Sequence, residues 1–236
     1  MPEAVLQHDH ALRKVSAGSL SSSKGTLKMP LPLSRVLPDE GFPEGSVVEL
    51  AAPANLGQGV SVALSACAES QSQAREKRGE SAWCAFVDPF RTLHGPAVRA
   101  SGVCLQRLLV VRPPHRMLAR VALKIASSQI FSVIVIDLAG VPGANHEPAR
   151  EDWSRLVRRL ALAIENGKST VLVLTDIHCS RSIALPVAMR VLLQRTSHEA
   201  LSVQIAKEKR GRVTGPRSIA WTRPPIECSI LAAQQG

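Results

Sequence analysis

Aromatic residues are scarce in this chain of 236 residues: they make up 3 % of it, and tyrosine is absent. A hydrophobic core must therefore be built mainly from Val, Leu, Ile and Ala. Hydrophobic residues still reach 45 % and charged residues only 20 %, so the composition excludes a wholly disordered chain. Aliphatic cores of this kind are typical of parallel β-sheets that helices cover on both faces.

Paired cysteines and long apolar runs are also lacking. The five cysteines stand apart, with no Cys-x-x-Cys pair, which argues against a zinc site and indicates reduced thiols. No apolar run approaches the roughly 20 residues that a membrane helix needs, and the N-terminus carries no apolar leader. We therefore expect a cytoplasmic protein that binds no metal and does not contact a membrane.

Acidic residues are outnumbered, because 29 Lys and Arg stand against 19 Asp and Glu, giving a net charge of +10. This excess favours an anionic partner, such as nucleic acid or an acidic protein, over a merely solvated surface. Possible DNA or partner contacts form two groups: Arg116 and Arg120 on one helix face, and Lys207, Lys209, Arg210, Arg212 and Arg217 near the C-terminus. We expect phosphate contacts mainly from the second group, and ordinary solvated faces on the helices around 116–124 and 155–159.

Alternating strands and helices are predicted along most of the chain. Apolar runs predict strands at about 47–50, 83–87, 108–111, 131–136 and 170–174, with helical spacing between several of them. This order indicates an α/β domain with a mostly parallel sheet flanked by helices. The alternation of Leu201, Val203 and Ile205 with polar residues predicts antiparallel strands at the C-terminal edge.

The chain is expected to divide into three parts. Residues 1–30 are predicted to be a flexible N-terminal segment, because they include a Ser- and Gly-rich stretch. Residues 31–224 form the core domain, and residues 225–236 form a C-terminal tail. No internal repeat is present.

The loop after the first predicted core strand joins it to a helix, as phosphate-binding loops do. A working loop follows the pattern G-x-x-x-x-G-K-[ST], in which Lys neutralises phosphate and the hydroxyl holds Mg²⁺. Here Gln58 replaces the Lys and Gly59 replaces the hydroxyl residue. The degenerate loop consists of Ala52, Pro53, Asn55, Gly57, Gln58 and Gly59. Taken alone, it is also consistent with a purely structural turn.

Four segments in this order resemble parts of the RecA recombinases. Residues 37–50 resemble the segment before their phosphate loop, Cys84–Asp88 their second core strand, Val133–Asp137 the strand that ends in the Walker B aspartate, and Lys207–Gly211 a basic turn near the end of their core. The resemblance, from about residue 31 to 223, implies a RecA-like fold with a degenerate P-loop NTPase core. Within that superfamily the chain resembles ImuA, the RecA-like accessory of bacterial mutagenesis cassettes, whose relatives include SulA-type division inhibitors.

The ImuA resemblance implies a role in the SOS response to DNA damage, in mutagenic translesion synthesis. The implied partners are an ImuB-type polymerase homologue, RecA and an error-prone polymerase, with single-stranded DNA as a further candidate.

The chain departs from active recombinases at the positions that carry their chemistry. Phe90 stands where RecA has its water-activating Glu, Leu138 follows the Walker B aspartate, and Thr175 to Ile177 replace a glutamine that senses phosphate and DNA. Asp137 alone is kept, either as a magnesium ligand or as a helix cap or arginine partner. We therefore expect no catalytic residue and no ATP or Mg²⁺ cofactor. Two alternatives stay open: an ATP-binding, DNA-dependent ATPase, and a SulA-like protein inhibitor.

Overall fold

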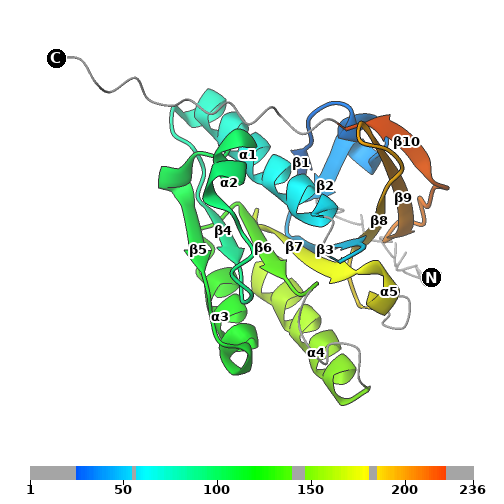
Figure 1. Ribbon diagram of the computed structural model, residues 1–236. Coiled ribbons are helices and arrows are strands. Elements are labelled where there is room, and N and C mark those ends of the chain that lie inside the picture. The colour runs from blue at the N-terminus through cyan, green and yellow to red at the C-terminus, as the bar shows by residue number, and fades with distance from the viewer. Residues whose placement is uncertain (1–24, 55–56, 140–146, 181–184, 222–236) are drawn as a thin grey trace, which may run out of the picture.

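The computed structural model of the protein describes residues 25–54, 57–139, 147–180 and 185–221, and the side chains of all of these except 147–152 and 179–180. Across these residues, eight strands form one sheet in the order β10-β9-β8-β3-β7-β6-β4-β5 (Figure 1). Their bounds are β3 (Ser46–Ala52), β4 (Cys84–Val87), β5 (Leu108–Val111), β6 (Val133–Asp137), β7 (Thr170–Asp176), β8 (Met189–Arg195), β9 (Ala200–Glu208) and β10 (Arg217–Ala220).

The sheet is parallel from β8 through β3, β7, β6 and β4 to β5, whereas β9 and β10 add antiparallel strands beyond β8. The central strands are buried on both faces, which explains their continuous aliphatic sequences: every residue of β3 and β6 is buried. The predicted α/β fold with its antiparallel C-terminal edge is thus confirmed.

Helices cover both faces of the sheet (Figure 1). One core cluster lies between the sheet and α1 and α2, and the other lies under α3 and α4. Their bounds are α1 (Gln58–Arg78), α2 (Gly95–Ala100), α3 (His115–Ser127), α4 (Glu147–Ile164) and α5 (Ile177–Ser180), with 3₁₀ turns η1 (Leu33–Arg35), η2 (Pro38–Glu40) and η3 (Leu105–Arg107). Among the described helices, none is both long and apolar enough to cross a membrane.

The folded part of the chain starts before the predicted boundary at residue 31. β1 (Thr26–Lys28) pairs antiparallel with β2 (Gly41–Pro43), and Leu27 is buried at 6 % exposure in the same core cluster as α1. Gly41 permits this pairing, because a Cβ there would collide with the backbone of Leu27. Three residues beside a Ser-rich stretch carry too little pattern to predict such a strand. Residues 1–24 and 222–236, which include the predicted tail, lie outside the described part.

Replacing Leu27 tests whether this hairpin belongs to the core. We expect Leu27→Ala to lower the free energy of unfolding by about 2–5 kcal/mol, because it leaves a cavity between β1 and α1. Leu31→Ala is the matched control, since Leu31 is 66 % exposed, and should change stability by no more than about 0.5 kcal/mol. Denaturant unfolding measures both. Equal, small effects would mean that residues 25–30 are not part of the core.

Candidate functional site

The degenerate loop leaves the sheet at the carboxyl end of its central strand. β3 lies between the parallel strands β7 and β8 and passes through Ala52 and Pro53 into the N-terminus of α1. Gly57 precedes α1 with φ 70°, a left-handed conformation that favours glycine. The strand, turn and helix of a phosphate-binding loop are therefore present, although Asn55 lies outside the described residues.

The position of the phosphate-binding lysine is occupied by a buried amide. Gln58 is only 2 % exposed, and neither its Oε1 nor its Nε2 has a hydrogen-bond partner among the described residues. Gly59, at the position of the metal-binding hydroxyl, faces Ala52 and Leu174. The loop can thus offer a phosphate backbone N–H groups and an amide, but no positive side chain and no hydroxyl ligand for Mg²⁺.

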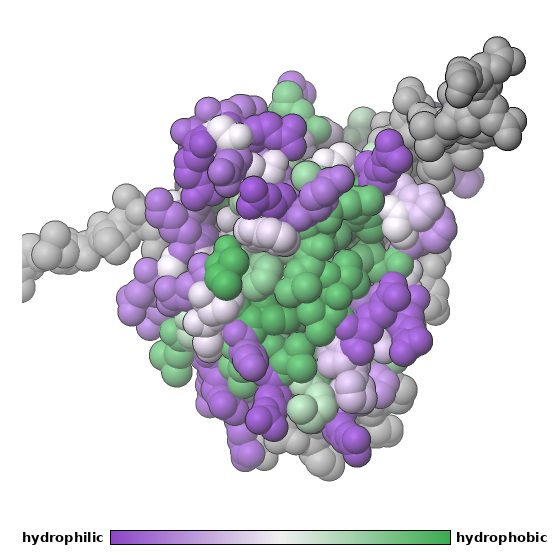
Figure 2. Space-filling view, turned by 90° about the vertical axis from the view of Figure 1, so that its left-hand side faces the viewer, coloured by the Kyte–Doolittle hydropathy of each residue, from purple (hydrophilic) through white to green (hydrophobic). Residues whose placement is uncertain are grey.

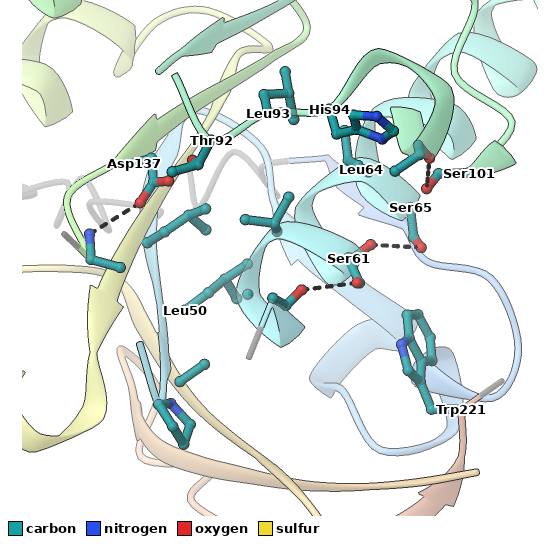
Figure 3. Close-up of a pocket in the computed structure, with 18 of the residues that line it drawn as sticks. Leu50, Ser61, Leu64, Ser65, Thr92, Leu93, His94, Ser101, Asp137 and Trp221 are labelled. Carbon is teal, nitrogen blue, oxygen red and sulfur yellow. Dashed lines mark hydrogen bonds between the residues drawn. The ribbon is translucent and has the colours of Figure 1, made fainter. Parts of the chain in front are cut away.

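Beside the loop lies a cavity of about 690 Å³ (Figure 3). Its walls come from the end of β3, one side of α1, the segment after β4, α2, and Trp221 after β10. Most of the lining is apolar, and among the described residues that line it there is neither Lys nor Arg. A nucleoside triphosphate would bring several negative charges into this space and meet no cation.

Three serine hydroxyl groups on the cavity wall are already engaged by the protein's own backbone. Ser61 Oγ donates to Gly57 O at 2.9 Å, Ser65 Oγ to Ser61 O at 3.0 Å, and Ser101 Oγ to Ala97 O at 2.9 Å (Figure 3). Each hydroxyl proton is therefore used within its own helix. The cavity suits an uncharged, largely apolar group better than a phosphate.

Asp137 ends β6 at the edge of the cavity and binds the backbone of its own turn. Its Oδ1 accepts the N–H of Ala139 at 3.0 Å. Burial raises the pKa of Asp137 above its ordinary value, and the nearby charge of Asp88 raises it further, against the effect of the Ala139 bond. The structure therefore gives this carboxylate a local cap in place of the expected helix cap or arginine pair. Within the described part of the chain, no three His, Cys, Asp or Glu residues are grouped to hold a metal ion.

A second aspartate, Asp88, organises the turn after β4. It is fully buried and accepts the backbone N–H groups of Thr92 at 2.9 Å and Leu93 at 3.2 Å, while Arg112 Nε lies 3.3 Å from it. The ring of Phe90, at the position of the water-activating Glu, lies with its centroid 5.0 Å from that of the His115 ring, tilted by 50°. Phe90 therefore makes a packing contact where a recombinase would position water. The Asp-Pro turn in the sequence marked this strand end but not the role of Asp88.

Much of the positive charge on the C-terminal hairpin is neutralised within the protein. Arg212 donates to both oxygens of Asp39, at 2.8 and 2.7 Å, and lies 3.4 Å from Glu208. Arg210 is 3.6 Å from Asp39, and Lys207 Nζ donates to a backbone carbonyl at 3.1 Å. The hydrogen bonds from Arg212 hold the pKa of Asp39 below its ordinary value. Of the five predicted contacts in this group, Lys209 and Arg217 are exposed and have no such partner among the described residues.

An apolar surface over the outer edge of the sheet was not predicted. β5 is the last strand and pairs only with β4 among the described strands. Figure 2 shows a broad hydrophobic area on this side of the molecule, surrounded by hydrophilic residues. Its large exposed members include Trp83 (39 %), Leu105 (45 %), Leu109 (40 %) and Val110 (37 %). The sequence identified β5 as a strand but contains nothing that shows which strand is outermost.

Nucleotide binding is testable by thermal unfolding. We expect about 1 mM Mg²⁺–ATP to leave the Tm unchanged, because the loop has no cation for the phosphates. A site with a Kd near 10 μM would add about 2.7 kcal/mol under these conditions, and roughly 5–11 °C for a chain of this length. A shift of that size, abolished by Gln58→Ala, would restore the ATPase alternative.

The raised pKa of Asp137 predicts how its replacement depends on pH. A carboxyl group whose pKa is raised on folding stabilises the protein below its ordinary pKa of 3.8, and loses that contribution as the pH rises through the raised value. At pH 7 Asp137→Asn should therefore be at least as stable as the parent, since the amide oxygen still caps Ala139. The advantage should shrink as the pH falls toward 4. Lower stability of the variant at pH 7 would indicate a bound cation near Asp137.

Neither a protein-family model nor a curated protein matches this chain. Among solved structures, it is similar to the crystal structure of the RadB recombinase, with a TM-score of 0.62 and 14 % identity over 78 % of this chain and 90 % of that chain. A likeness at this level of identity establishes architecture, not activity. The chain therefore has the RecA-like α/β fold, with a mostly parallel sheet, flanking helices and an antiparallel C-terminal edge.

Proposed function

We propose that the chain is a non-catalytic, RecA-like accessory protein of the bacterial DNA-damage response. It acts in the cytoplasm, in SOS mutagenesis and translesion synthesis, as an ImuA-type protein. The resemblance of residues 37–50 and 133–137 to RecA segments supports this proposal, as does the RecA-like fold. Its partners would be an ImuB-type polymerase homologue, RecA and an error-prone polymerase.

The chemistry of the loop supports binding rather than hydrolysis. Phosphoryl transfer depends on positioning and on charge stabilisation by a cation, a metal and a group that orients water. Gln58, Gly59 and Phe90 stand at the three positions that would supply these groups. The cavity beside them lacks Lys and Arg among its described residues. The protein would therefore act without ATP turnover.

The observation that carries the proposed binding function is the open apolar edge at β5. Soluble proteins protect sheet edges with Lys, Pro, bulges or a covering segment, because an open edge pairs with other chains. All four residues of β5 are aliphatic, and Leu109 and Val110 are exposed. An apolar surface of this breadth in a soluble protein usually marks a protein interface.

A partner segment in extended conformation fits this edge. Its backbone would hydrogen-bond along β5, and its apolar side chains would contact Leu109 on one face and Val110 on the other. The nearby cations do not repel it, since Arg107 pairs with Glu80 at 3.2 Å and lies 5.2 Å from the Trp83 ring centroid. The surface is thus shaped by apolar contact and backbone pairing, with charge as a minor contribution.

A charge placed on this edge tests the proposal. We expect Leu109→Glu to weaken binding to the ImuB-type polymerase homologue by about tenfold or more, because it buries a charge in an apolar interface. Val213→Glu is the matched control, since Val213 is 60 % exposed on the loop between β9 and β10, and should bind as the parent does. Titration calorimetry on the purified full-length chains measures both.

Three results are informative. Equal binding by both variants would reject β5 as the docking surface. If the polymerase homologue does not bind the parent chain at all, the proposed partner is wrong. Binding of a filament-forming division protein through β5 would instead favour the SulA-like inhibitor.

A further inference from the structure

The outer faces of α3 and α4 carry a set of exposed cations on one side of the sheet. Each helix buries its apolar side against the sheet, through Leu118 and Ala122 on α3 and Leu156 and Leu160 on α4. The opposite sides point to solvent. We call their exposed cations the α3/α4 basic face: Arg116, Arg120, Lys124, Arg158 and Arg159.

Three of these cations form a row on α3, and the other two are consecutive residues of α4. Arg116, Arg120 and Lys124 recur every four residues, so they lie on one side of α3 in a row roughly 12 Å long. α4 runs beside α3 (Figure 1), where Gln129, just after α3, donates to Ala163 O at 3.5 Å. Packed helices lie about 8–10 Å apart. Arg158 and Arg159 therefore place a second group of charge next to the first.

The charges of this face are not neutralised by the described part of the protein. No ion pair joins any of the five cations to a described carboxylate. The nearest acidic residue along the chain whose side chain the structure describes is Glu165, which is exposed and follows the end of α4 at Ile164. The sequence also has Glu147, Glu151 and Asp152 at the start of α4, before Arg158 and Arg159. On the C-terminal hairpin, by contrast, Asp39 and Glu208 engage Arg210 and Arg212.

We propose that the α3/α4 basic face binds the phosphate backbone of nucleic acid. Long cationic side chains that have no ion-pair partner among the described residues, clustered on two neighbouring helices, supply what backbone phosphates need. Trp153 is the one Phe, Trp or Tyr among the described side chains of these helices, and it is partly buried, so base stacking contributes little and binding is independent of sequence. This site is separate from β5 and does not depend on the proposed polymerase partner.

Fluorescence anisotropy with a labelled single strand and the corresponding duplex tests this inference on the full chain without nucleotide. If all five cations contact phosphates, log K for the single strand should fall with log salt with a slope of about −3.5 between about 50 and 200 mM. Comparing the affinity for the duplex with that for the single strand shows which form of nucleic acid binds more tightly, since both present phosphate. Absence of binding to both at about 50 mM salt would overturn the proposal.

Two double variants with the same change in net charge locate the site. Arg120→Glu with Arg158→Glu removes two cations of the basic face, and Lys209→Glu with Arg217→Glu removes the two unpaired cations of the C-terminal hairpin. We expect the first pair to weaken binding by about 20-fold at about 0.1 M salt and to reduce the slope by about 1.4. The second pair should weaken it less than about threefold, through net charge alone.

Equal losses in the two double variants would mean that DNA responds only to net charge, and a larger loss in the hairpin variant would place the site there. Either result rejects the α3/α4 basic face. All four positions are exposed, and an unchanged Tm shows that the variants stay folded. Loss of polymerase binding in Leu109→Glu with DNA binding intact would separate this inference from the proposed function.

Discussion

A buried carboxylate at the centre of the sheet constrains the rest of the structure. Glu49 on β3 is fully buried; its Oε1 accepts Thr175 Oγ1 of β7 at 2.8 Å, and its Oε2 lies 3.3 Å from Arg190 Nε of β8. Burial raises the pKa of Glu49, and the charge of Arg190 opposes that shift. A buried charge is costly unless it is paired. The three strands are therefore stable together in one register, in which both partners reach Glu49.

β8, the strand that carries Arg190, is also where the sheet changes from parallel to antiparallel pairing. Arg190 faces Glu49 across the parallel β3–β8 pair, and the pairing of β8 with the antiparallel β9 shifts between Arg190 and Val191. Such an irregularity re-aims side chains while the strand continues. β3 ends at Ala52, which is the first residue of the degenerate loop. One strand thus supports both the loop and the antiparallel edge, and neither needs a lysine or a metal ligand. A lysine at the buried, unpartnered position of Gln58 would instead carry a desolvation penalty whenever phosphate is absent.

The sequence predicted those features that depend on local pattern. Continuous aliphatic runs such as Val133–Ile136 placed the buried strands, and their order with the helices gave the fold. The residue types at Gln58 and Gly59 alone predicted that the loop lacks a phosphate-binding cation and a hydroxyl ligand for Mg²⁺. The partners of the cations could not be predicted, because Arg212 binds Asp39 from 173 positions away. The exposure of Leu109 could not be predicted either, since an edge strand and a central strand can have the same sequence pattern.

The C-terminal hairpin and the α3/α4 basic face both contribute to the net charge of +10, but their cations differ in whether described carboxylates pair with them. On the hairpin, carboxylates pair with Arg210 and Arg212, so this basic stretch forms a stable turn more than an anion site. On α3 and α4 the cations keep their charge, next to an apolar edge where charge contributes little. Salt screens the attraction between the α3/α4 cations and phosphate, but it does not weaken the burial of apolar surface at β5. If both proposed sites bind partners, raising the ionic strength would release the partner on the helices while the partner at β5 stays bound, because the two surfaces rely on different forces.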